Sequence, residues 1–153
     1  KLTMSDRYKI LSQVDINTIT APYDDVVIYS VPQASSTSYS ITPIASGVSG
    51  SAEVSPESVS INTQTLLTSM VFAFNGSGAS ISGDIKIRNG VAPSPRNYLM
   101  RNLVFYDKQN STLDIRMPLS PGSTLYFIPT AYTSGNLYVT AFGIELETGY
   151  GPS

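Results

Sequence analysis

The sequence predicts an all-β fold, an antiparallel β-sandwich of jelly-roll type with about eight to ten strands and no substantial helix. Three observations lead to this prediction. Apolar and polar residues alternate with period two in many segments, as in Thr112 to Met117. Clusters of Gly, Pro, Asn, Asp and Ser separate these segments at intervals of roughly 8–13 residues. No stretch shows the 3.6-residue period of an amphipathic helix.

The C-terminal third carries the strongest pattern, with four predicted strands between residues 97 and 146. Residues 103–106 and 112–117 flank a polar, turn-rich pentapeptide, so a hairpin is expected there. Two further strands are expected at 124–128 and 137–146, each preceded by Gly, Pro, Ser or Asn.

The N-terminal strands are expected at 8–19 and 26–31. In the first, Val14 and Ile16 should share one face, with Asp15 and Asn17 on the other. Weaker patterns follow: a short strand at 39–42, a loop or an edge segment with weakly fixed register at 46–58, and renewed alternation at 58–62.

A second hairpin is expected from residues 65–74 and 79–88, because Asn75-Gly76 between two strand patterns is a strong hairpin signal. The alternation in the second strand places its isoleucines inward, at Ile81, Ile85 and Ile87, and its polar residues outward, at Ser82, Asp84, Lys86 and Arg88. Residues 91–96 form a connection, since neither proline in it has an N–H to donate.

The chain is expected to comprise a polar N-terminal arm (1–7), a single β-sandwich domain (8–147) and a C-terminal tail (148–153). Lys1 in place of Met suggests a processed or truncated start, and nothing before Tyr8 has the apolar core of a signal peptide. The longest apolar run, 70–74, is far shorter than the ~20 residues of a membrane-spanning helix.

Composition argues against several functions. The chain has no Cys and no His, which removes thiolate chemistry, a Ser-His-Asp arrangement and the commonest transition-metal ligand. Charged residues are only 13% with a net charge of −2, so no nucleic-acid partner is expected. No phosphate-binding loop occurs, and no cofactor is predicted. A surface rich in hydroxyls and amides favours a virion or extracellular location.

Five acidic residues are candidates for a metal site or a catalytic site. Asp24 and Asp25 could contribute to a Ca²⁺ site, but adjacent carboxylates in a turn are more often turn formers. Asp84, Asp107 and Asp114 could include the two carboxylates of a glycosidase, although each lies near a predicted turn or on an outward strand face. We therefore predict neither a metal site nor catalytic residues.

Three strands fail to alternate and so place large side chains on both faces. They lie at 103–106, 125–128 and 137–144. One face of each should meet the core, and the second needs a cover, which is either a loop of the same chain or another subunit. The second alternative predicts a homo-oligomer, a trimer or a dimer, with Tyr106, Tyr126 and Tyr138 near the contact.

Tyrosine is the enriched residue type that could serve a binding function. The chain has ten Tyr and no Trp. Aromatic rings in loops stack against sugars and also anchor protein interfaces. Tyr23 and Tyr132 are therefore the candidates for stacking on a host glycan. Two glycosylation sequons, at Asn75 and Asn110, fall in predicted turns, and turn chemistry accounts for both.

The segment 118–127, in which a Pro-Gly turn leads into the aromatic strand Leu125-Tyr126-Phe127, resembles strand entries in many jelly-roll and sandwich proteins. The closing segment 140–146 is similar to terminal strands of small virion proteins. The chain thereby resembles a bacteriophage or viral capsid, head-decoration or fibre-knob domain. This resemblance implies a non-enzymatic structural protein that packs in many copies with other virion proteins. A carbohydrate-binding or adhesin module is the second hypothesis, and a glycan hydrolase is the third.

Overall fold

The computed structural model describes residues 8–20, 23, 25–31, 48–54, 63–90 and 93–147. These residues contain no helix, and they form the following strands: β1 (Tyr8–Ile19), β2 (Val26–Ser30), β3 (Val48–Val54), β4 (Thr63–Asn75), β5 (Ser80–Arg88), β6 (Arg96–Tyr106), β7 (Gln109–Leu119), β8 (Thr124–Tyr132) and β9 (Asn136–Glu147). The predicted all-β fold is confirmed. Accordingly, the described residues include no helix that could span a membrane.

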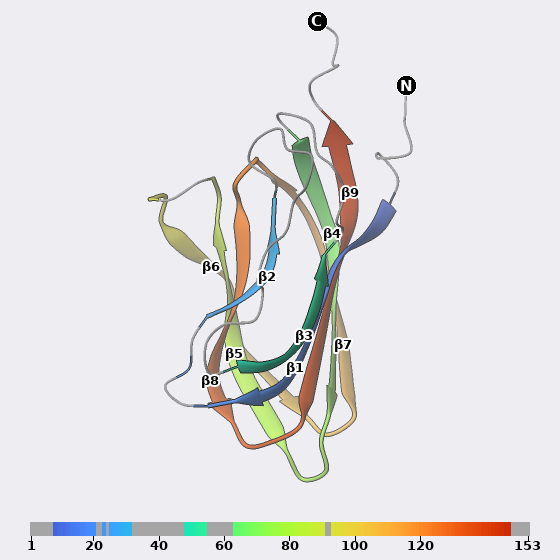
Figure 1. Ribbon diagram of the computed structural model, residues 1–153, viewed down its shortest axis with the longest axis vertical. Coiled ribbons are helices and arrows are strands. Elements are labelled where there is room, and N and C mark those ends of the chain that lie inside the picture. Colours follow the sequence, from blue (N-terminus) through green and yellow to red (C-terminus); the bar gives the residue numbers. More distant parts are fainter. Residues whose placement is uncertain are drawn as a thin grey trace, which may run out of the picture.

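The strands form two antiparallel sheets that pack face to face (Figure 1). One sheet has the order β3-β1-β9-β4-β7, and the other has the order β2-β8-β5-β6. The pairs are nested along the chain: β1 pairs with β9, β2 with β8, β4 with β7 and β5 with β6. A long hairpin rolled into two sheets gives this nesting, so the sandwich is a jelly roll with β3 added at one edge.

β3 lies in the segment 46–58, for which the sequence predicted either a loop or an edge strand. Among the described strands it pairs with β1 alone, at the end of the five-stranded sheet, and the register of that pair shifts between Ile16 and Thr18. Its small residues and glycine explain why the alternation there is weak.

The core lies between the sheets and follows the predicted alternation. Val14 and Ile16 are buried on β1, and Ile81, Ile85 and Ile87 are buried on β5. Across the core, the rings of Phe72 on β4 and Phe105 on β6 are stacked with their centroids 5.3 Å apart. At Gly83 on β5 an added Cβ would lie 2.5 Å from the Phe127 ring, so only glycine allows the two strands this close approach.

Both predicted hairpins are wrong, although their turns are in the right places. β4 and β5 lie in opposite sheets, and so do β6 and β7. The turn after β4 is closed by the Ala79 amide donating to the Gly76 carbonyl at 3.1 Å. Turn residues specify that the chain reverses direction. At the end of a sandwich, however, the strand after the turn can join the facing sheet as easily as it can pair with the strand before the turn. Long-range pairing therefore decided the partner of each strand.

Asp84 is also placed differently from the prediction, since its side chain is buried instead of facing outward. Its Oδ1 accepts a hydrogen bond from the Asn102 amide at 2.8 Å. Asn102 has a φ of 62°, and the register of β5 with β6 shifts beside it. This bulge places β6 over the Asp84 carboxylate and provides the carboxylate with a backbone hydrogen-bond donor.

Four predicted features lie outside the described residues. They are the arm at 1–7, the short strand at 39–42, the alternation at 58–62 and the tail at 148–153.

Candidate functional site

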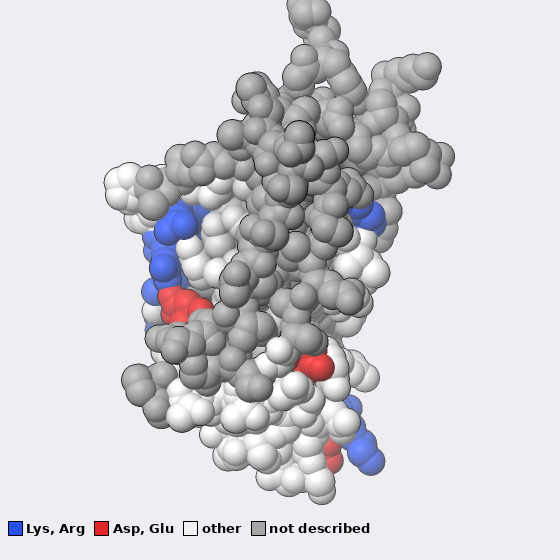
Figure 2. All heavy atoms as spheres, viewed as in Figure 1, with Lys and Arg blue, Asp and Glu red and all other residues white. Residues whose placement is uncertain are grey.

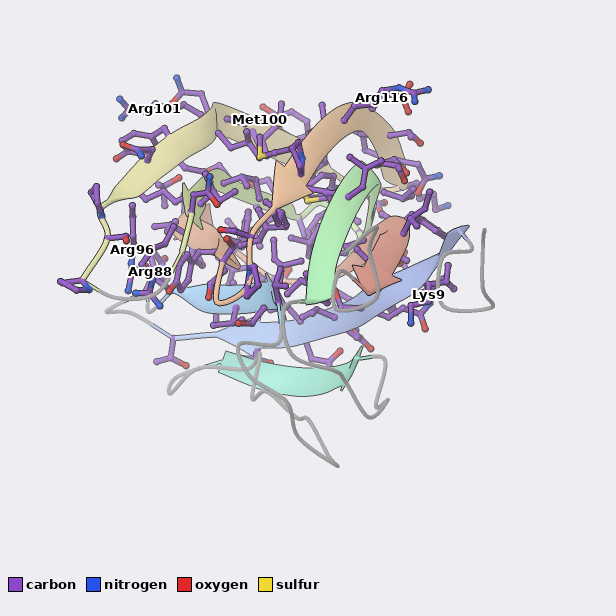
Figure 3. The ribbon with its side chains drawn as sticks, turned by 90° about the horizontal axis from the view of Figure 1, so that it is seen from above. Lys9, Arg88, Arg96, Met100, Arg101 and Arg116 are labelled. Atoms are coloured by element: carbon purple, nitrogen blue, oxygen red, sulfur yellow. The ribbon has the colours of Figure 1, made fainter. Side chains whose placement is uncertain are left out.

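One side of the sandwich, where the edge strands β6 and β7 lie, has core-facing side chains that the described residues cover only in part. We call this surface the open edge. Its partly buried apolar side chains pack against the core, and they are Leu99, Met100, Leu103, Leu113, Ile115 and Met117. On β6 only Phe105 is buried, and on β7 only Leu119. Figure 3 shows Met100 and Arg116 on this side of the molecule.

The outward face of β6 adds further apolar surface to this side. Its exposed fractions are 47% for Tyr98, 42% for Val104 and 62% for Tyr106. Elsewhere in the described part of the chain, Ile10 and Tyr138 are the large apolar residues that are exposed. Both β6 and β7 end their sheets, so each has an unpaired backbone edge among the described strands.

The three tyrosines predicted at a subunit contact are not brought together. Tyr106 is exposed on the outer face of the four-stranded sheet, whereas Tyr138 is 39% exposed on β9, in the opposite sheet. Tyr126 is only 5% exposed. The guanidinium carbons of Arg96 and Arg88 lie 4.1 and 5.7 Å from its ring centre and cover it. Tyr126 therefore has almost no surface to offer a partner.

The two tyrosines predicted to stack on sugars both pack against the core. Tyr23 and Tyr132 are half-buried. The Tyr132 hydroxyl lies 2.8 Å from the backbone carbonyls of both Asn17 and Gly135, which share its single proton. Burial raises the pKa of Tyr132 above its ordinary value of 10.0. These contacts tie the end of β8 to β1, which is a structural role.

The acidic residues form no common site in the described part of the chain, which holds no group of three His, Cys, Asp or Glu that could bind a metal. Asp25 forms an ion pair with Arg96, while Asp24 lies outside the described residues. Asp107 Oδ1 accepts from the Gly76 amide at 3.0 Å. Asp114 is exposed on β7. Two of the three glycosidase candidates, Asp84 and Asp107, thus serve as acceptors for backbone amides.

Four cations on the outer face of the four-stranded sheet were not singled out by sequence reasoning. They are Lys86 and Arg88 on β5, and Arg96 and Arg101 on β6. Each lies over a tyrosine ring. The registers of β5 with β6 and β8 bring these residues together. The sequence indicated this face only through the alternation in β5, which places Lys86 and Arg88 outward.

Comparison with known proteins does not assign the chain to a family. No family model matches the chain, and no curated protein matches it. Among solved structures, a chain in the structure of the infectious bursal disease virus Gx strain matches with a TM-score of 0.46 and 10% identity. The match covers 97% of this chain and 35% of the viral chain, so this chain spans about a third of that protein's length. The jelly-roll assignment rests instead on the strand pairing described above.

Proposed function

We propose that the protein is a non-enzymatic structural subunit of a virion, of the capsid, decoration or fibre type, and that copies assemble through the open edge. The observation that carries this proposal is that β6 and β7 leave their core-facing side chains only partly covered. Jelly rolls occur in viral capsid domains, in lectins and in cupins, so the fold alone does not select among these functions.

Covering the open edge would stabilise an assembly. A tyrosine ring that is about half exposed leaves on the order of 100 Å² to cover, which is worth roughly 2.5 kcal/mol at ~25 cal/mol per Å². Tyr106 and Val104, together with the partly buried leucines and methionines, offer several such contributions. A second copy brings the same apolar strands, and in a dimer or trimer it would also pair the free backbone edges.

The two other hypotheses have less support from the contacts. An adhesin that stacks sugars on Tyr23 and Tyr132 would need rings that are free, whereas both pack against the core. A glycan hydrolase would need a pair of free carboxylates, whereas Asp84 and Asp107 accept hydrogen bonds from backbone amides. A virion location and assembly with other virion proteins follow from the structural role that we propose.

Electron microscopy of the purified chain, with sedimentation velocity, tests this function. We expect closed or regularly repeating assemblies. Replacing both Val104 and Tyr106 by Ser should reduce them to free subunits with an unchanged β-type circular dichroism spectrum. The matched control is Ile10→Ser, which removes an exposed apolar side chain from β1 and should leave assembly intact. Wild-type protein that stays a monomer and is retained by a glycan array would favour the adhesin instead.

A further inference from the structure

The outer face of the four-stranded sheet carries a compact group of cations and aromatic rings, which we call the cationic face. It consists of Lys86, Arg88, Arg96 and Arg101 with the rings of Tyr98 and Tyr126. Lys86 Nζ lies 4.5 Å from the Tyr98 ring centre, and the Arg101 guanidinium carbon lies 4.1 Å from it. Arg88 and Arg96 lie over Tyr126. Figure 3 shows Arg88, Arg96 and Arg101 on the same side of the molecule.

The register of β5 with its neighbours explains this grouping. Lys86 pairs with Tyr98 on β6 and with Tyr126 on β8, and Arg88 pairs with Arg96. Residues two apart on a strand point to the same face and are about 6.6–6.8 Å apart. Lys86 and Arg88 on β5 have that spacing, whereas Arg96 and Arg101 are five residues apart on β6.

Most of this positive charge is not neutralised by the described residues. The chain carries nine Lys and Arg against eleven Asp and Glu, yet four of the nine cations lie on this one face. The acidic groups beside them are Asp25, which pairs with Arg96, and Asp84, which accepts from the Asn102 amide. Figure 2 shows blue atoms gathered beside β6 with a smaller red group next to them.

A donor on this face also lacks a partner. Arg88 Nε is buried, and it has no hydrogen-bond partner among the described residues. An arginine N–H that is removed from water without an acceptor is unfavourable, but because this atom is covered, an oxyanion reaches it only after the Arg88 side chain moves. The stacked rings hold the guanidinium groups in place, which reduces the entropy that an anion must overcome to bind them.

The aromatic rings themselves are poorly placed to stack on a ligand. Tyr126 is almost fully buried, and two cations already lie over the ring of Tyr98. Binding of single-stranded nucleic acid depends on free ring faces for the bases, so this face suits it poorly. Ser82 on β5 and Thr130 on β8 form a hydrogen bond at 3.0 Å, and Ser82 lies four residues before Lys86 on β5, which is about 13 Å at ~3.3 Å per residue. A ligand that carries both acidic groups and alcohols must be extended to contact the cations and these hydroxyls together.

We propose that the cationic face binds an anionic carbohydrate, in which sulfate or carboxylate groups contact the four cations and sugar hydroxyls contact Ser82 and Thr130. This site does not include the sugar-stacking candidates Tyr23 and Tyr132, but it adjoins the open edge, since Tyr98 lies on the outward face of β6 and Ser82 pairs with Val104.

Calorimetric titration of the whole chain with a sulfated heparin hexasaccharide tests the proposal, with neutral maltohexaose as the comparison ligand. The sulfated sugar should bind and the neutral one should not. The double variant Lys86→Gln/Arg101→Gln should weaken binding by about tenfold or more, since it removes two charge-assisted contacts. The charge-matched control Lys108→Gln/Arg116→Gln alters two cations on and beside β7 and should change binding less than about twofold.

Three results would overturn the proposal. Equal weakening in both double variants would mean that the attraction is a general effect of net charge. If oligothymidylate of equal charge bound as tightly and depended in the same way on Lys86 and Arg101, the face would be assigned to nucleic acid. Sodium sulfate that displaces the hexasaccharide at equal sulfate concentration would mean an isolated anion site. If the double variant fails to fold, Arg101→Gln alone replaces it, because Arg101 is exposed and its recorded contact is with the Tyr98 ring.

Discussion

The two sides of the sandwich are built from similar apolar sequences but differ in how well those sequences are covered. On the side formed by β1 and β2, the core-facing residues are buried, and they are Leu11, Val14, Ile16, Ile19, Val26 and Ile28. On the side formed by β6 and β7, most core-facing residues are only partly buried. In Figure 3, seen from above, β6 and β7 lie on one side of the pair of sheets and β1, β2 and β3 on the other.

This difference teaches that apolar content does not by itself decide burial. β2 and β6 both end the four-stranded sheet, but the facing sheet continues past β1 to β3 on the side of β2, whereas it ends at β7 on the side of β6. β8 has large side chains on both faces too, and its outer ring, Tyr126, is covered because β5 and β6 supply arginines beside it. Apolar strands thus end up closed or open according to their neighbours, and the open edge is the part of the described surface that most needs another subunit.

Truncating one isoleucine on each side gives the largest expected effect and tests whether the two sides differ in how well they are covered. Ile28→Ala on the closed side should lower the free energy of unfolding by about 3–4 kcal/mol, because it leaves a cavity in a packed core. Ile115→Ala on the open edge should cost about 1 kcal/mol in the monomer, because water reaches part of the side chain. Urea titrations at a concentration where the protein is monomeric measure both values. Equal losses would mean that the two sides are closed alike.

The bulge in β6 provides a second test, because it shapes the open edge. Asp84→Ala leaves the Asn102 amide without its acceptor and should lower the free energy of unfolding by about 1–3 kcal/mol. Asp114→Ala on β7 removes an exposed carboxylate and should change it by less than about 0.5 kcal/mol. Thermal unfolding followed by circular dichroism compares the two variants. A neutral Asp84→Ala would show that the bulge does not need this carboxylate.

A smaller effect than that of Ile28→Ala is expected at Tyr132, whose hydroxyl bonds to β1. Tyr132→Phe removes the hydroxyl that bonds to Asn17 and Gly135, and it should lower the free energy of unfolding by about 1 kcal/mol at neutral pH.

Tyr132 also makes stability depend on pH. Its folded pKa is raised above the ordinary value of 10.0, so the folded state holds the phenol proton more tightly than the unfolded state does. The corresponding contribution to stability is complete below pH 10 and is lost as the pH rises through the folded pKa. Urea titrations between pH 9 and pH 11 should therefore show a smaller decline for Tyr132→Phe than for the wild type. Parallel declines would assign the alkaline loss to other groups.

The sequence predicted the strands far better than their partners. Alternation and turn residues located β1, β4, β5 and the four C-terminal strands, because both signals are local. The Asn75-Gly76 turn gave no information about which sheet β5 would join, since sheet partners depend on contacts between residues far apart in the chain.

The candidate sites show the same limit. Exposure of Tyr106 and Tyr138 agrees with strands that have two apolar faces, whereas the cover over Tyr126 comes from arginines on two other strands. The cationic face depends on cross-strand register, and a register cannot be derived from alternation alone. Whether Tyr106 or Tyr138 lies at a subunit contact stays a prediction.

Multi-angle light scattering on the wild-type chain, from micromolar concentration downward, tests the central claim that the open edge is a surface between subunits. We predict a molar mass that is a multiple of 16.4 kDa and that falls to one subunit when Val104 and Tyr106 are both replaced by Ser. A wild-type chain that remains at 16.4 kDa across the whole range would contradict the claim.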